Sequence, residues 1–193
     1  MNTFKSLFLT SAILAAMSTQ VHAADGTINF TGEIIAASCE ISGGAGANVS
    51  GAAGNQVVDV NLGKVSMDSL GGAAGAGIAG GTAINLLIDC GNTAAGLNSV
   101  ELKFDPIAGS GIDARNGKLL RTEGTAVGVG IGIYDTNNQL LNLQATQPFV
   151  AALVQNGDNY TAALNMRAGY VANGDVVEPG TANGTLPFTL SYK

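Results

Sequence analysis

Apolar and polar residues alternate along the segment "GTINFTGEII", residues 26–35. Side chains of a β-strand point alternately to its two faces, so this segment is predicted to be a strand with one apolar face. That face consists of Ile28, Phe30, Gly32 and Ile34. Segments near a chain terminus are usually disordered unless something binds them. The pattern therefore raises the question of which hydrophobic core this face covers.

Similar short segments recur along the rest of the chain, separated by clusters of glycine, asparagine and aspartate. Including the continuation of the first, they are 28–41, 56–65, 82–90, 99–106, 126–135, 139–144, 148–154, 160–171 and 184–193. The last one places Leu186, Phe188, Leu190 and Tyr192 on one face. About eight or nine short strands without a sustained helical pattern are typical of a two-sheet β-sandwich. The predicted fold class is therefore all-β.

Glycine changes this picture in three places. In the segment 126–135, three glycines alternate with valine and isoleucine, so one face of this strand is predicted to be bare of side chains. Two tracts rich in glycine and alanine, 42–55 and 71–81, offer few side chains for a core. Such tracts are flexible, and both are predicted to be surface loops.

Residues 1–23 have the three zones of a secretory signal peptide. Lys5 supplies the positive charge, an apolar stretch covers 7–17, and Val21-His22-Ala23 fits a cleavage site. An N-terminal anchor helix is the alternative, but the stretch falls short of the roughly 20 apolar residues that span a bilayer. The mature chain, 24–193, is then the size of one domain.

Cys39 and Cys90 are the only cysteines of this exported chain. An even pair of cysteines in an oxidising compartment predicts one disulfide. A redox-active thiol pair is the alternative, which their wide separation disfavours, because such pairs are typically spaced Cys-x-x-Cys.

The charge and the residue types exclude several classes of function. With 14 acidic and 8 basic residues the net charge is −6, so the chain lacks the basic surface that nucleic acids or anionic membranes require. The single histidine, His22, lies in the signal peptide, which excludes histidine-based catalysis and imidazole metal sites from the mature chain. We therefore expect neither an enzyme nor a bound metal.

Two motifs suggest ligand sites but lie in the wrong context. Residues 75–80 match G-x-G-x-x-G, yet they follow a glycine run and precede a strand-like segment, whereas a dinucleotide site follows a strand and opens a helix. Residues 135–139 begin like a calcium loop, but Leu140 and Thr146 replace its required glycine and glutamate. We interpret 135–139 as a hairpin turn and predict no cofactor.

Four stretches together identify a family. "FTGEIIAASCEI" resembles its opening strand with the first cysteine, "INLLIDC" its strand with the second, and "VGVGIGIYD" its central strand. The end of the chain is the most specific, because members typically have a penultimate tyrosine and a glycine fourteenth from the C-terminus. Tyr192 and Gly180 occupy these positions. The mature chain thus resembles the chaperone–usher fimbrial subunits of Gram-negative bacteria, in particular the type 1 major-pilin family.

The resemblance implies an incomplete immunoglobulin-like β-sandwich that is completed by a donor strand from a neighbouring subunit. Residues 24–35 would be the donor-strand extension and 36–193 the pilin domain. Ile28, Phe30 and Ile34 would fill pockets of the next subunit's groove, and Gly32 would lie where the groove is too shallow for a side chain. This answers the question of which core the N-terminal strand covers.

The resemblance also implies partners and a location. A periplasmic chaperone would first bind the groove and the carboxylate of Lys193, and an outer-membrane usher would then exchange the chaperone's strand for a donor strand. The residues implied in the C-terminal groove strand and the chaperone contact are Gly180, Leu186, Phe188, Leu190, Tyr192 and Lys193. The product would be a homopolymeric surface fimbria that supports adhesion or biofilm formation.

Two alternatives stay open at this point, a carbohydrate-binding tip adhesin and a minor adaptor subunit. Adhesins of this kind carry an additional N-terminal domain, for which the chain has no room. Only Ala24 and Asp25 precede the donor segment, and the glycine- and alanine-rich tracts are unusually long, so a minor adaptor is not distinguished from a major shaft subunit.

Overall fold

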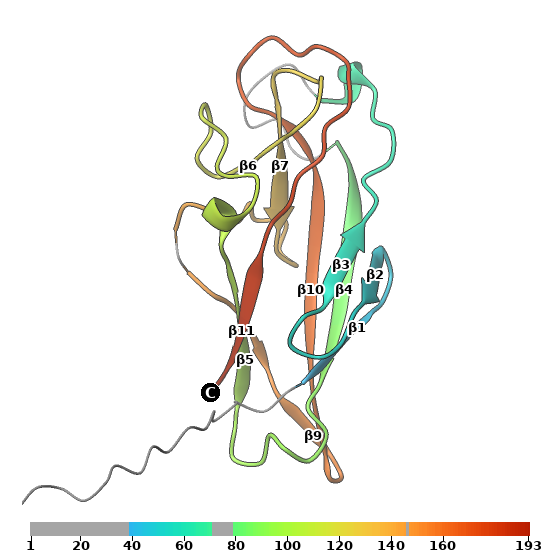
Figure 1. Ribbon diagram of the computed structural model, residues 1–193, viewed down its shortest axis with the longest axis vertical. Helices are drawn as coiled ribbons and strands as arrows, with labels where there is room; N and C mark the ends of the chain where they lie inside the picture. Colours follow the sequence, from blue (N-terminus) through green and yellow to red (C-terminus); the bar gives the residue numbers. More distant parts are fainter. Residues whose placement is uncertain (1–38, 71–78, 146) are drawn as a thin grey trace, which may run out of the picture. The chain divides into compact units, whose positions relative to one another are not determined.

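The described part of the chain consists mainly of β-strands, which confirms the predicted fold class (Figure 1). The computed structural model describes residues 39–70, 79–145 and 147–193. Its strands are β1 (Glu40–Gly43), β2 (Ala47–Ser50), β3 (Val57–Val60), β4 (Ala79–Asp89), β5 (Ser99–Phe104), β6 (Leu120–Arg121), β7 (Val129–Tyr134), β8 (Phe149–Ala152), β9 (Val154–Asn156), β10 (Asn159–Ala172) and β11 (Phe188–Tyr192). The helices in these ranges are two short 3-10 turns, η1 (Met67–Leu70) and η2 (Pro106–Ala108). No helix among the described residues could cross a bilayer.

The larger sheet has the strand order β1-β4-β10-β7-β6, and β9 also pairs with β10. Its pairings are antiparallel, and β4 and β10 form the longest ladder, from Asp89 opposite Thr161 to Thr82 opposite Ala168 before the register shifts. Alternate residues of these two strands point into the core. Ile88 and Leu164 are completely buried, whereas Leu87 is exposed on the other face. This alternation is what the sequence pattern predicts.

The smaller sheet has the order β11-β5-β8, and β2 and β3 form a separate two-stranded sheet. Val100 and Leu102 of β5 are almost fully buried against the same core cluster as the inward residues of β4 and β10. Cys39, directly before β1, and Cys90, directly after β4, are joined by a disulfide, which confirms their predicted pairing. The covalent bond closes a loop with a sequence separation of 51 residues.

Two local predictions are wrong. The tract 42–55 is not a loop, because it contains the end of β1 and all of β2, which pairs with β3. Ala47 is buried and Val49 half-buried, so even this tract contributes to the core. The segment 139–144 is not a strand, since Leu140 makes only an isolated bridge with Tyr134. For the second tract, 71–78 lie outside the described residues, while 79–81 belong to β4.

The predicted turn at 135–139 is present, and Asp135 organises it. The side chain of Asp135 accepts hydrogen bonds from the backbone N–H groups of Asn137 (2.9 Å) and Gln139 (2.7 Å). Asn138 has a φ of 57°, in the left-handed region that asparagine tolerates. The carboxylate of Asp135 therefore stabilises this turn.

Gly130 and Gly132 leave one face of β7 without side chains of its own, and neighbouring segments cover it. A Cβ at Gly130 would lie 2.9 Å from the Cβ of Leu119, and one at Gly132 would lie 3.0 Å from side-chain atoms of Leu140 and Val171. Leu119 and Val171 belong to a small apolar cluster on this face. Glycine is thus required because neighbouring chain segments approach β7 closely.

Candidate functional site

The backbone of β11 is bonded along one edge. Lys193 donates its N–H to the carbonyl of Ser99 (3.0 Å) and accepts the Ser99 N–H in return (2.9 Å). Further up the strand, the carbonyl of Pro187 accepts the N–H of Asp105 (2.8 Å). Alternate residues of an antiparallel strand point their N–H and C=O groups to opposite edges. Residues 187, 189, 191 and 193 therefore face β5.

The other edge of β11 is open. By the same alternation, Phe188, Leu190 and Tyr192 point their N–H and C=O groups away from β5, and β5 is the only described strand that pairs with β11. An open edge of this kind binds another strand readily.

The residues at the open edge also carry apolar side chains toward the core. Leu186, Phe188, Leu190 and Tyr192, here called the β11 row, all pack against the main core cluster, and all remain half-buried. On the neighbouring strand β5, Val100 and Leu102 are 0% and 1% exposed. The intervening residues Thr189 and Ser191 are exposed on the outer face. Within the described ranges, the row is therefore an inward-facing surface that is only partly covered.

A second half-buried row packs against the same core. Val58 and Val60 of β3 and the following Leu62, here called the β3 row, contact the core cluster but stay partly exposed. β3 pairs with β2 on one edge and with no other described strand. In the part of the chain that the structure describes, two incompletely covered rows thus pack on the core, and each lies on a strand with one unpaired edge.

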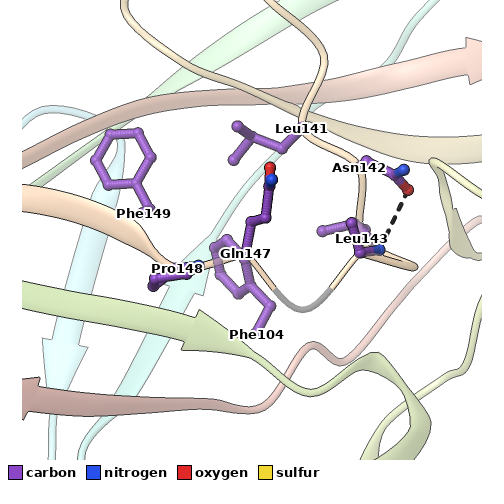
Figure 2. A pocket seen from close by; sticks show the side chains of 8 residues that line it. Phe104, Leu141, Asn142, Leu143, Gln147, Pro148 and Phe149 are labelled. Atoms are coloured by element: carbon purple, nitrogen blue, oxygen red, sulfur yellow. Dashed lines mark hydrogen bonds between the residues drawn. The ribbon is translucent and has the colours of Figure 1, made fainter.

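The apolar surface continues beyond the β11 row. Phe104 of β5 lies directly opposite Phe188 and lines two recesses, of about 100 and 320 Å³. Figure 2 shows the smaller recess, where the side chains of Phe104, Leu141 and Phe149 gather. The surface beside the β11 row can therefore bind apolar side chains.

Among the described residues, no cluster of three or more histidine, cysteine, aspartate or glutamate side chains could hold a metal ion.

Tyr192 makes a hydrogen bond in addition to its packing against the core. Burial raises the pKa of its phenol above the usual 10.0, and a hydrogen bond with the backbone of Cys39 acts in the opposite direction. At the same end of the strand, the ammonium of Lys193 lies 3.5 Å from the carboxylate of Glu101. The lysine side chain of this ion pair is largely exposed to solvent, so the pair contributes little to stability.

The structure separates Gly180 from the other residues predicted for the C-terminal strand. Gly180 precedes β11, in a segment that pairs with 123–127 through bridges from Glu178 to Val127 and from Asn183 to Glu123. A Cβ at Gly180 would collide with the backbone of Ala126. Glycine is therefore needed for this contact within the chain. The predicted donor residues Ile28, Phe30, Gly32 and Ile34 lie outside the described residues.

Sequence reasoning missed the β3 row as part of the site. The signal was present, because Val58, Val60 and Leu62 are in phase along 56–65. What the sequence lacks is the information that this strand has no second neighbour among the described strands. The pattern alone does not distinguish a fully covered strand from one at an incomplete edge.

Comparison with known proteins places this arrangement in context. The family model described as "Fimbrial protein" matches residues 28–193. The chain is 32% identical to long polar fimbria protein A of Salmonella typhimurium, with 98% of this chain and 97% of that protein covered. It is 31% identical to the major fimbrial subunit SMF-1 of Stenotrophomonas maltophilia, with 93% and 99% covered.

Among solved structures, the P pilus rod subunit PapA is similar to this chain. The TM-score is 0.52 at 20% sequence identity, and the match covers 86% of this chain and all of PapA. At this identity the likeness concerns the fold, which is an immunoglobulin-like sandwich as predicted.

Proposed function

The chain belongs to the fimbrial protein family, and we propose that it is a structural subunit of a surface fimbria that polymerises by donor-strand exchange. The observation that supports this most is the β11 row, in which the same residues carry half-buried apolar side chains and backbone groups that pair with no second strand of the described ranges. A strand from a second copy would cover the side chains and pair with the backbone at the same time.

The segment 24–35 has the pattern that such an acceptor requires. Its apolar positions 28, 30, 32 and 34 are spaced by two, as are positions 186, 188, 190 and 192 of the β11 row. An antiparallel partner continues the arrangement of the sheet and is slightly more stable per residue than a parallel one. In an antiparallel pair, all four positions of the segment lie opposite the four positions of the β11 row when Ile28 is opposite Tyr192 and Ile34 is opposite Leu186.

This register places Gly32 opposite Phe188. Residues directly opposite each other in a sheet point to the same face, with Cβ atoms about 5 Å apart. Phe188 has a bulky aromatic side chain, so a donor residue without a side chain at that point avoids overpacking. Phe30 would then lie opposite Leu190.

The joint between subunits is expected to be tight. Ile28, Phe30 and Ile34 would each contribute roughly 1.5–3 kcal/mol when fully buried. The backbone bonds to Phe188, Leu190 and Tyr192 would add to this and fix the register. Dissociation of one subunit from the next should therefore be very slow.

The same open edge would need protection before assembly. A periplasmic chaperone would cover the β11 row and bind the carboxylate of Lys193, and an outer-membrane usher would exchange it for the donor strand of the next subunit. The better fit of the donor strand would drive this exchange without a nucleotide. The finished homopolymer would lie outside the cell and support adhesion or biofilm formation.

A matched pair of substitutions tests the proposal in bacteria that express the fimbria. Leu190→Glu places a charge in the β11 row, whereas Ser191→Glu places one on the exposed outer face of the same strand. We expect electron microscopy to find filaments with Ser191→Glu and none with Leu190→Glu. Immunoblotting of periplasmic extracts with chaperone co-expressed checks that both subunits are made. Normal filaments with Leu190→Glu would contradict the proposal.

A further inference from the structure

β3 is held in place by little backbone pairing. It forms a two-stranded sheet with β2 and pairs with no other strand in the described ranges. An isolated two-stranded ribbon is at best marginally stable in water. The β3 row nevertheless stays against the core, so other interactions must fix the position of this strand.

Gln56, immediately before β3, bonds the edge of β1. Its side-chain Nε2 donates to the carbonyl of Ile41 and its Oε1 accepts the Ile41 N–H, both at 2.8 Å. Gly44 donates its N–H to the carbonyl of Asn85, so the even-numbered residues of this segment face β4 and Ile41 faces away from it. The amide of Gln56 thus takes the place of a neighbouring strand at Ile41.

A second side-chain bond holds the far end of β3. Asn61 directly follows the strand, and its carbonyl accepts a hydrogen bond from the Oγ1 of Thr82 in β4 (3.0 Å). The side chain of Asn61 also accepts the N–H of Gly63 (2.8 Å), which turns the chain away from the sheet. β3 is therefore tied at its start to β1 and at its end to β4.

We propose that Gln56 and Thr82 are positioning residues for strand capture, by which we mean the binding of segment 24–35 of a second copy to this chain. They hold the β3 row against the core cluster that the β11 row also contacts. Segment 24–35 of a second copy can then contact both rows without a rearrangement of β3. This inference rests on the proposed function. It adds that capture depends on two polar side chains that belong to neither row.

The test uses the purified mature chain, residues 24–193, refolded at low concentration, and a fluorescent synthetic peptide of residues 24–35. Capture is followed by fluorescence anisotropy. We expect Gln56→Ala to weaken capture about tenfold, because two neutral hydrogen bonds are lost. Thr82→Val should weaken it severalfold. Gln155→Ala in β9 and Thr136→Val in an exposed turn are the matched controls and should leave capture unchanged.

Gln56→Glu tests whether capture needs the hydrogen bonds to Ile41 and not merely a side chain of this length. At neutral pH its carboxylate cannot donate to the carbonyl of Ile41, so capture is weak. Below the ordinary glutamate pKa of about 4.3, the protonated carboxyl group donates and accepts as an amide does. Capture relative to wild type should therefore recover on acidification. The neighbouring carboxylates Glu40, Asp59 and Asp89 are present in both proteins, and their repulsion of a carboxylate at position 56, which wild type lacks, is screened by measuring the ratio at high salt.

The outcomes separate the two proposals. If wild type captures the peptide and Gln56→Ala captures it equally well, Gln56 does not position β3, while the proposed function stands. A pH-independent ratio for Gln56→Glu would contradict the inference in the same way. If wild type captures no peptide, the proposed function falls and this inference falls with it.

Discussion

Lys193 and Ser99 exchange two backbone hydrogen bonds, and this pair determines which edge of β11 is free. Because the bonding direction alternates along a strand, the pair assigns Ser191 and Thr189 to the side of β5 and leaves Tyr192, Leu190 and Phe188 on the open side. A partner strand must then pair with these three residues. The predictions below follow from that assignment.

The proposed register predicts which cysteine pairs cross-link neighbouring subunits. Thr31 would lie opposite Thr189, with both side chains on the outer face. We expect Thr31→Cys combined with Thr189→Cys to give a covalent ladder on non-reducing gels, because directly opposite strand residues have suitable spacing for a disulfide. Thr31→Cys with Ser191→Cys, displaced by two residues, should cross-link poorly. Efficient cross-linking of the displaced pair instead would refute the register.

Gly32→Leu should prevent polymerisation. In the proposed register the new side chain meets Phe188, and overpacking of this kind typically costs about 1–3 kcal/mol. Filament length by electron microscopy is the measurement. Thr31→Leu, on the opposite face of the same strand, is the control and should assemble. Filaments of normal length with Gly32→Leu would mean that the inward face of the donor strand is assigned wrongly.

Stability should fall at alkaline pH partly through Tyr192. Burial raises the pKa of its phenol, so the folded state favours the neutral form. This contribution is fully present below about pH 10, where an unfolded tyrosine ionises, and is lost as the pH rises through the higher folded value. Tyr192→Phe should therefore flatten the alkaline decline of the denaturant midpoint in a donor-complemented chain. Tyr134 and Tyr170, whose pKa values are also raised by burial, should contribute in the same direction. An unchanged pH profile would contradict this role for Tyr192.

Removal of the disulfide should destabilise the domain strongly. Closing a loop of this length contributes about 4 kcal/mol in the chain-entropy picture. The double substitution of Cys39 and Cys90 by serine should lower the free energy of unfolding by about that amount, measured by denaturant titration of a donor-complemented chain. A loss below about 1 kcal/mol would show that other contacts already hold β1 to β4.

Local patterns predicted the elements whose own residues carry the signal. The alternation along 160–171 and 184–193 gave β10 and β11, and the aspartate-led turn at 135–139 was recognised from its residue types. β2 was missed because its small residues in a glycine-rich tract resemble a loop, and only pairing with β3 makes it a strand. The cover over Gly130 comes from Leu119, which lies outside the strand, so no local pattern reports it.

The site was predictable to a similar extent. The inward phase of the β11 row followed from its period of two, whereas its open edge depends on which strands pair, a property of the whole fold. The sequence groups Gly180 with the C-terminal strand, but Gly180 contacts the backbone of 125–126 through a close approach that sequence spacing does not encode. The role of Gln56 could not be predicted from the sequence. Its side-chain amide bonds the backbone of Ile41 only because the fold brings these two residues together.

The most direct test of the account supplies the missing strand within one chain. Residues 25–35 are deleted from the N-terminus and appended after Lys193 through a short glycine-rich linker, which gives the donor a high local concentration at the nearby Tyr192 end of β11. Denaturant unfolding then compares this chain with one that lacks 25–35 altogether. We predict a soluble, chaperone-independent monomer with a much higher unfolding midpoint for the extended chain. Equal stability of the two as monomers would mean that the sandwich is already complete, and it would contradict donor-strand exchange as the basis of assembly.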